Sequence, residues 1–156
     1  LIQQIKAPSL NDLSVIASDF DCSLLCTALR LIDVNTVPAI LASYDGNGLR
    51  WFLRTPDIPA RWYLKDCLDE DSFAYELLQC GKIQAGLRKS SADTWFTNAD
   101  GSDYELREHS VEGYRGEILT LLLPDNAMLN ASYDADAFPK RYNENGAYTP
   151  KRPKKR

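Results

Sequence analysis

The stretch Pro38-Ala-Ile-Leu-Ala-Ser-Tyr-Asp45-Gly-Asn-Gly48-Leu-Arg-Trp-Phe-Leu-Arg-Thr55 holds two apolar runs on either side of a tight reversal. Glycine adopts a positive φ at little cost, and Asn and Asp tolerate it, so primed hairpin turns select Asp-Gly-Asn-Gly. We therefore expect strands at residues 37–43 and 49–54, paired as an antiparallel hairpin. No helix follows these glycines, as a phosphate-binding loop would require, so we assign them to the turn alone.

Two short helices are expected directly before this hairpin, between Ser9 and Val34. Ser9 can cap the first helix, and Ser23 can cap the second after a break at Asp21. Two helices joined by a tight connection resemble a helix-turn-helix unit. Because such short helices are unstable alone, we expect the pair to pack on the rest of the chain.

The chain after the hairpin indicates one more helix and further strands. Acidic residues at 69–71 suit a helix start, and Gly81 suits its end. Residues 82–88 are a weaker strand candidate, a one-turn element is expected around Trp95, and residues 104–111 and 117–123 read as strands. The prediction is an α+β protein, in which a short helical pair precedes an antiparallel sheet with a flanking helix. Residues 125–156 show no sustained period and are expected to form an extended or disordered basic tail.

The net charge of −4 hides an asymmetry along the chain. Residues 1–123 carry a net charge of −7 and residues 124–156 one of +3. An acidic folded part would repel a nucleic-acid backbone, although the basic end could bind phosphates. No apolar run approaches the roughly 20 residues of a membrane helix, and no secretory signal is present, so we expect a cytoplasmic protein without a membrane partner. The chain begins with Leu1, so we expect it to be a piece of a longer polypeptide.

Cysteine and histidine usage gives no metal site. The four cysteines form no Cys-x-x-Cys pair, and His109 is the single histidine. We expect buried, reduced thiols and predict no metal or cofactor in this chain. His109 is expected to be a structural strand residue, because no nucleophile motif accompanies it.

Two candidate binding sites remain open on residue chemistry. The first is a ligand pocket, in which aromatic side chains surround an anion bound by arginine. It would comprise Arg50, Trp51, Arg54, Trp62 and Trp95. The second is a nucleic-acid surface on the second helix and the basic end. It would comprise Ser23, Thr27, Arg30, Lys151, Arg152, Lys154, Lys155 and Arg156. Core packing by the tryptophans, and a helix pair that serves only as a spacer, are the competing interpretations.

Three stretches together resemble the ImmA/IrrE metallo-endopeptidase family. Ala17-Ser-Asp-Phe-Asp-Cys-Ser23 followed by Ala28-Leu-Arg-Leu31 is similar to the segment after the family's catalytic helices. Pro38 with Gly48-Leu-Arg-Trp51 is similar to its opening hairpin. Three further elements are similar to those that close the family's long form. They are Ala92-Asp-Thr-Trp95, Leu106-Arg-Glu-His-Ser110 and Tyr114-Arg-Gly-Glu-Ile-Leu-Thr-Leu-Leu122.

The resemblance implies three units: a helix-turn-helix-like pair at 1–36, a GAF-like α+β domain at 37–124 and the tail at 125–156. It implies a non-catalytic regulatory or sensor region, because the family's His-Glu-x-x-His zinc motif is absent from this chain. Zinc would then be held by a preceding peptidase domain. The implied partners are a helix-turn-helix repressor, the peptidase domain itself and a small-molecule signal. The alternative function is a DNA-binding or DNA-anchoring module that uses the helix pair and the basic end.

Overall fold

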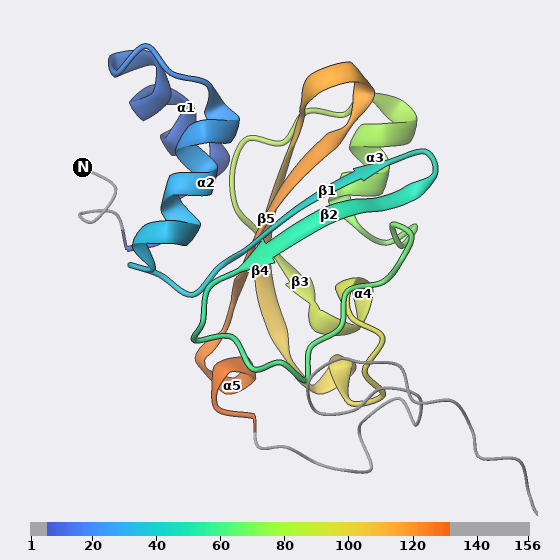
Figure 1. Cartoon of the computed structure of the whole chain (residues 1–156). Helices are drawn as coiled ribbons and strands as arrows, with labels where there is room; N and C mark the ends of the chain where they lie inside the picture. Colours follow the sequence, from blue (N-terminus) through green and yellow to red (C-terminus); the bar gives the residue numbers. More distant parts are fainter. Residues whose placement is uncertain (1–5, 132–156) are drawn as a thin grey trace, which may run out of the picture.

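The computed structural model describes residues 6–131 and has an α+β fold, as the sequence predicts (Figure 1). Helices lie on both faces of one antiparallel sheet. The elements in chain order are α1 (Leu10–Asp19), α2 (Leu24–Val34), β1 (Ile40–Asp45), β2 (Gly48–Arg54), α3 (Phe73–Cys80), β3 (Arg88–Ser91), α4 (Ala92–Trp95), η2 (Gly101–Asp103), β4 (Glu105–Glu112), η3 (Tyr114–Gly116), β5 (Ile118–Pro124) and α5 (Asn126–Leu129).

The five strands lie in the order β2-β1-β5-β4-β3. Each neighbouring pair is antiparallel, and β5 is the central strand, with Leu121 opposite both Leu41 and His109. β2 and β3 therefore form the two edges. β2 has seven residues and β3 has four, so the predicted hairpin supplies the longer edge strand.

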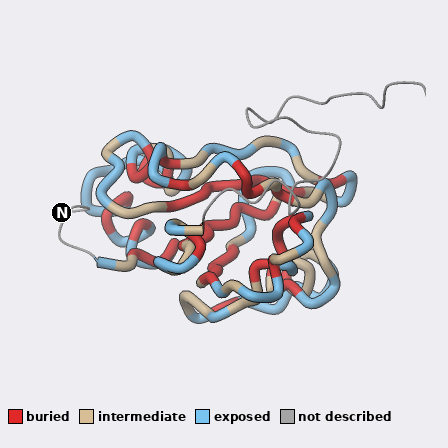
Figure 2. Tube along the Cα trace, turned by 90° about the horizontal axis from the view of Figure 1, so that it is seen from below, coloured by how far each residue is buried: buried red, intermediate tan, exposed pale blue. Residues whose placement is uncertain are grey.

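Alternate residues of the strands face two separate hydrophobic layers. Leu41 and Leu121 pack with Leu13 and Leu31 of the helix pair. Their neighbour Leu122 faces the other layer, which includes α3 and the buried tryptophans. Figure 2 shows the buried trace running through the middle of the molecule. The helix pair thus shares a hydrophobic layer with the sheet, as expected for helices too short to be stable alone.

Serine caps start both helices of the pair at the predicted residues. The Ser9 hydroxyl accepts the Asp12 N–H, and Asp12 bonds back to Ser9 in a capping box. Ser23 caps α2 by accepting the Cys26 N–H. Asp21 (φ 50°) turns the chain between the helices, and Asn35 (φ 51°) ends α2 in the left-handed conformation.

A carboxylate of the sheet joins the start of α3. Ser72 caps this helix by accepting the Tyr75 N–H, and Gly81 ends it with a φ of 67°. The Glu108 carboxylate of β4 accepts the Phe73 N–H at 2.8 Å. The helix predicted after residues 69–71 is therefore confirmed, and a strand residue fixes its first turn.

The hairpin differs from the prediction in its turn geometry. Gly48 alone in the loop has a positive φ, of 112°, whereas a primed turn would place it at the two central residues. A Cβ at Gly48 would lie 2.4 Å from the Asp66 carbonyl oxygen, which accepts the Leu49 N–H at 2.7 Å. Because Gly48 has no Cβ, the loop at 55–72 can approach the edge of β2 at this residue. The expectation that Gly48 serves the turn alone is therefore wrong.

Three local expectations are wrong. Residues 82–87 form no strand, and the edge strand β3 begins instead at Arg88. The chain after Pro124 first forms the short helix α5, whose Met128 is fully buried. The cysteines at 22, 26, 67 and 80 are all exposed rather than buried. The rest of the expected basic tail, residues 132–156, lies outside the described residues.

Candidate functional site

Two of the five predicted pocket residues are core residues instead. Trp62 and Trp95 are buried in the layer beneath α3. Trp62 Nε1 donates to the Met128 carbonyl at 3.1 Å, and Trp95 Nε1 donates to the Glu108 carboxylate. Both indole donors are therefore satisfied by protein groups, as buried tryptophans require. The core-packing interpretation is correct for these two residues.

The two predicted anion-binding arginines already have protein partners. Arg50 Nε lies 3.4 Å from an Asp45 carboxylate oxygen. Arg54 Nη1 donates to the Trp62 carbonyl at 3.1 Å, and the guanidinium lies 5.2 Å from the centre of the Phe52 ring. Burial lowers the pKa of Arg54 from its ordinary value. Arg54 thus ties the edge strand to the following loop, and the five residues do not line one pocket.

Trp51 lies on the opposite face of β2 and lines an apolar groove of about 370 Å³ beside α2. Helix residues form one wall of this groove and strand residues form the other. The α2–β2 groove comprises Leu25, Leu29, Trp51, Phe52 and Leu53. Leu25, Phe52 and Leu53 expose 41%, 39% and 45% of their surface, so the groove is open to solvent.

Sequence reasoning missed four of these groove residues, although a signal for them exists. The buried stripe of α2 contains Ala28, Leu31 and Ile32. Leu25 and Leu29, four residues apart, form a second apolar stripe beside this buried face, in which Leu29 is partly buried against the core and Leu25 is exposed. Leu53 shares the face of Trp51 because it is two residues further along the strand. The excess of apolar residues over core positions is the signal for a groove.

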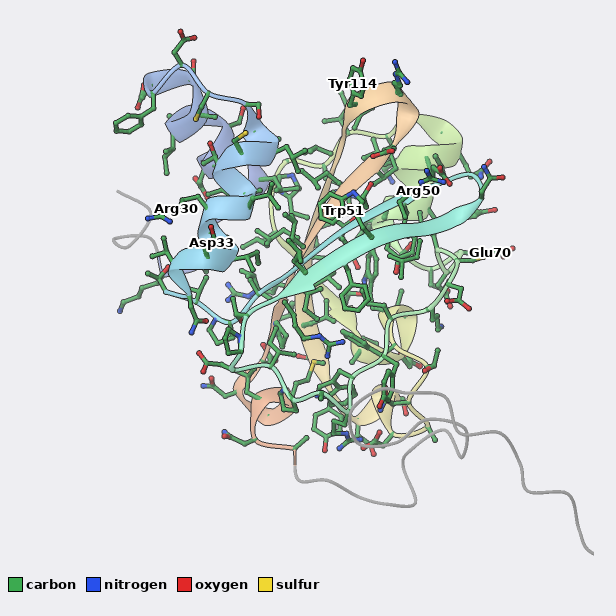
Figure 3. The ribbon with its side chains drawn as sticks, viewed as in Figure 1. Arg30, Asp33, Arg50, Trp51, Glu70 and Tyr114 are labelled. Carbon is green, nitrogen blue, oxygen red and sulfur yellow. The ribbon has the colours of Figure 1, made fainter. Side chains whose placement is uncertain are left out.

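Two charged residues of α2 follow Leu29 in the sequence and pair with each other. Asp33 follows Leu29 by one helical turn, and its side chain is 71% exposed. Arg30 lies 3.9 Å from Asp33 and points away from the sheet, on the side of α2 opposite Trp51 (Figure 3). Residues 6–131 carry 11 Lys and Arg against 19 Asp and Glu, a net charge of −8. The groove therefore lies on a strongly acidic body.

The candidate nucleic-acid residues of α2 do not form one exposed surface. The Ser23 hydroxyl is occupied by the helix cap. Thr27 is buried and donates to the Ser23 carbonyl at 3.1 Å. Of these three, Arg30 alone presents a charged side chain to solvent, beside the opposing charge of Asp33. Lys151, Arg152, Lys154, Lys155 and Arg156 lie outside the described residues.

Two buried ionisable groups of β4 have structural contacts. Burial raises the pKa of Glu108, although hydrogen bonds from Trp95 and Phe73 oppose this shift. His109 Nδ1 accepts the Leu10 N–H at 3.0 Å, which joins β4 to the first residue of α1. Burial lowers the pKa of His109, whereas the backbone of Gln84 and the charge of Asp12 act in the opposite direction. Among residues 6–131, no three His, Cys, Asp or Glu side chains are grouped so that they could hold a metal ion.

No protein-family model matches this chain, and no curated protein matches it. Within the described part of the chain, every helix is too short or too polar to span a bilayer.

Proposed function

We propose that this chain is a non-catalytic regulatory module that binds a protein partner through the α2–β2 groove. The observation that carries the proposal is the groove itself, which is lined by five apolar residues from two elements, with the side chains of Trp51 and Leu53 on the strand face toward α2. Single exposed apolar residues are common, whereas contiguous ones typically mark a binding surface. Trp62, which is buried in the core, and Arg54, which is hydrogen-bonded to the Trp62 carbonyl, are left out of this site.

The partner segment that fits this groove is an amphipathic helix with a basic polar face. A groove walled by a helix and a strand suits the apolar side of such a helix, through residues spaced three and four apart. The net charge of −8 on residues 6–131 favours basic partners and speeds their association. Asp33, one turn beyond Leu29, is paired with Arg30, so the net charge rather than this single carboxylate supports the basic partner.

The resemblance to ImmA/IrrE metallo-endopeptidases supplies the wider context of this proposal. The chain would be the regulatory or sensor region of such a peptidase and would help to control a transcriptional repressor or stress response. The zinc site would belong to a preceding domain, and the partner would be the repressor or that domain. The DNA upstream of the codon for Leu1 tests the parentage. An in-frame sequence that encodes His-Glu-x-x-His would support it, and a stop codon directly upstream would contradict it.

Two synthetic helical peptides of equal length test the groove. One carries a leucine stripe with lysines on the polar face, and the other carries glutamates in place of the lysines. We expect the full chain to bind the lysine peptide more tightly in a fluorescence-anisotropy titration. Leu53→Asn should weaken this binding about tenfold, because burying one such side chain contributes about 1.5–3 kcal/mol. Ile83→Asn is the matched control, since Ile83 is 86% exposed and lies outside the groove.

Three results would overturn the proposal. Equal affinity for the two peptides would contradict the preference for a partner with a basic face. An unchanged affinity in Leu53→Asn would place the contact outside the groove. Tight binding of arbitrary duplex DNA with a steep salt dependence, in the absence of peptide binding, would favour the DNA-anchoring alternative.

A further inference from the structure

His109 joins the helix pair to the sheet through one buried hydrogen bond. The ring lies in β4, is fully buried, and has Leu121 of β5 opposite it. Its Nδ1 accepts the Leu10 N–H at 3.0 Å. Leu10 is the first residue of α1, where the backbone N–H groups have no partner within the helix. The imidazole therefore satisfies a donor that the helix itself cannot satisfy.

This hydrogen bond requires the neutral ring. Because Nδ1 is the acceptor, the neutral imidazole carries its proton on Nε2. A second proton would bind Nδ1 and place an N–H group against the Leu10 N–H. The contact would then change from attraction between donor and acceptor to repulsion between two donors, inside the buried layer that holds α1 on the sheet.

The groups around His109 do not remove this sensitivity. From α1, Asp12 supplies a negative charge that favours the imidazolium, but this carboxylate is already hydrogen-bonded to Ser9. From residues 82–87, the backbone of Gln84 also favours the imidazolium, while its side-chain Oε1 accepts the Ser110 N–H at 3.0 Å. The cation of that segment, Lys82, is paired with Glu76 at 3.2 Å. Desolvation dominates these influences, so the folded state favours the uncharged ring.

We propose that His109 is an acid-sensitive latch, whose neutral ring holds the first turn of α1 on the sheet and whose protonation releases that turn. Asn11 Nδ2 also bonds this turn to the Ala85 carbonyl, at 3.0 Å, but lies at the exposed surface. The latch opens toward acid because the folded pKa lies below the ordinary value of 6.5. As pH falls from 6.5 through the folded pKa, the open state gains protons before the closed state, and its relative population rises.

The single histidine makes the latch directly observable. In the untagged chain, one imidazole Cε1–H signal reports the titration of His109 by NMR. We expect a midpoint below 6.5 and a shift of the Leu10 amide signal with the same midpoint. A midpoint at or above 6.5, or a Leu10 signal that does not follow the titration, would overturn the proposal. This measurement needs no variant and does not depend on peptide binding.

Hydrogen exchange gives the second test, with His109→Asn as the matched variant. Asn Oδ1 can occupy the place of Nδ1 and accept the Leu10 N–H without titrating. After correction for intrinsic rates, exchange in residues 10–19 should accelerate below pH 6.5, approaching about tenfold per pH unit, and should stay flat in His109→Asn. Parallel acceleration in residues 118–124 would indicate global unfolding and contradict a local latch. The same acceleration in the variant would assign it to another group.

Discussion

Hydrogen-bond donors from two elements stabilise the buried carboxylate of Glu108. Its carboxylate accepts from the Trp95 indole and from the Phe73 backbone, so removing one donor leaves a charged group undersatisfied. We expect Trp95→Phe to lower the free energy of unfolding by about 1.5–3 kcal/mol at pH 7. Trp62→Phe is the control, because its indole donates to an uncharged carbonyl and its loss should cost about 0.5–1.5 kcal/mol. Urea unfolding of both variants measures the difference.

The same pair of variants gives a pH dependence with a defined sign. Burial raises the pKa of Glu108 above 4.5, so the folded state binds its proton more tightly than the unfolded state. The free energy of unfolding therefore falls as pH rises from 4.5 through the folded pKa. Trp95→Phe removes a hydrogen bond that favours the carboxylate and should enlarge this fall and extend it to higher pH. A penalty for Trp95→Phe that is equal at pH 4.5 and pH 7 would contradict the assigned role.

Two glycines of one hairpin predict opposite outcomes for the same substitution. Gly48→Ala should destabilise the protein by more than about 1 kcal/mol, because φ is 112° and the new Cβ would meet the Asp66 carbonyl. A Cβ at Gly46 meets no atom within 4 Å, and Gly46 has no positive φ. Gly46→Ala should therefore be neutral or slightly stabilising. Thermal melts of the two variants provide the comparison, and equal melting temperatures would refute the close approach.

At the scale of elements, caps rather than propensity define the helix pair. Ser9→Ala should lower stability by about 0.5–2 kcal/mol, because it removes the acceptor for the Asp12 N–H. The backbone and side-chain hydrogen bonds from Ser9 also hold the pKa of Asp12 below 3.8. The stability that these bonds contribute is therefore lost as pH falls through the folded pKa of Asp12. Ser14→Ala, on the exposed side of α1, is the control and should be neutral or slightly stabilising. Equal destabilisation by both substitutions in denaturant unfolding would argue against the cap.

Across the whole molecule, the sequence predicts the elements that are set by neighbouring residues. Ser9, Ser23 and Gly81 act locally, so the helix limits follow from the pattern alone. The strand at 82–88 fails because Gln84 serves instead as a buried partner of Ser110, which the local pattern cannot reveal. The predicted ligand pocket is wrong for the same reason, because the strand order decides which tryptophans lie in the core. Trp51 faces the groove only because β2 is an edge strand beside α2.

The shared layer between the helix pair and the sheet predicts a single cooperative unit at neutral pH. Leu13 of α1 is fully buried against Leu41 and Leu121. Leu13→Ala should cost about 2–5 kcal/mol, as typical for a large-to-small core change. Trp62 and Trp95 lie in the other layer, so with Trp51 replaced by Phe in both proteins the tryptophan fluorescence reports on the far side of the sheet. If the molecule unfolds as one unit, their transition should shift to lower denaturant together with the helical circular dichroism signal. If Leu13→Ala instead shifts the helical circular dichroism transition and leaves the tryptophan fluorescence transition unchanged, residues 1–36 would be an independent domain, as the family resemblance implies.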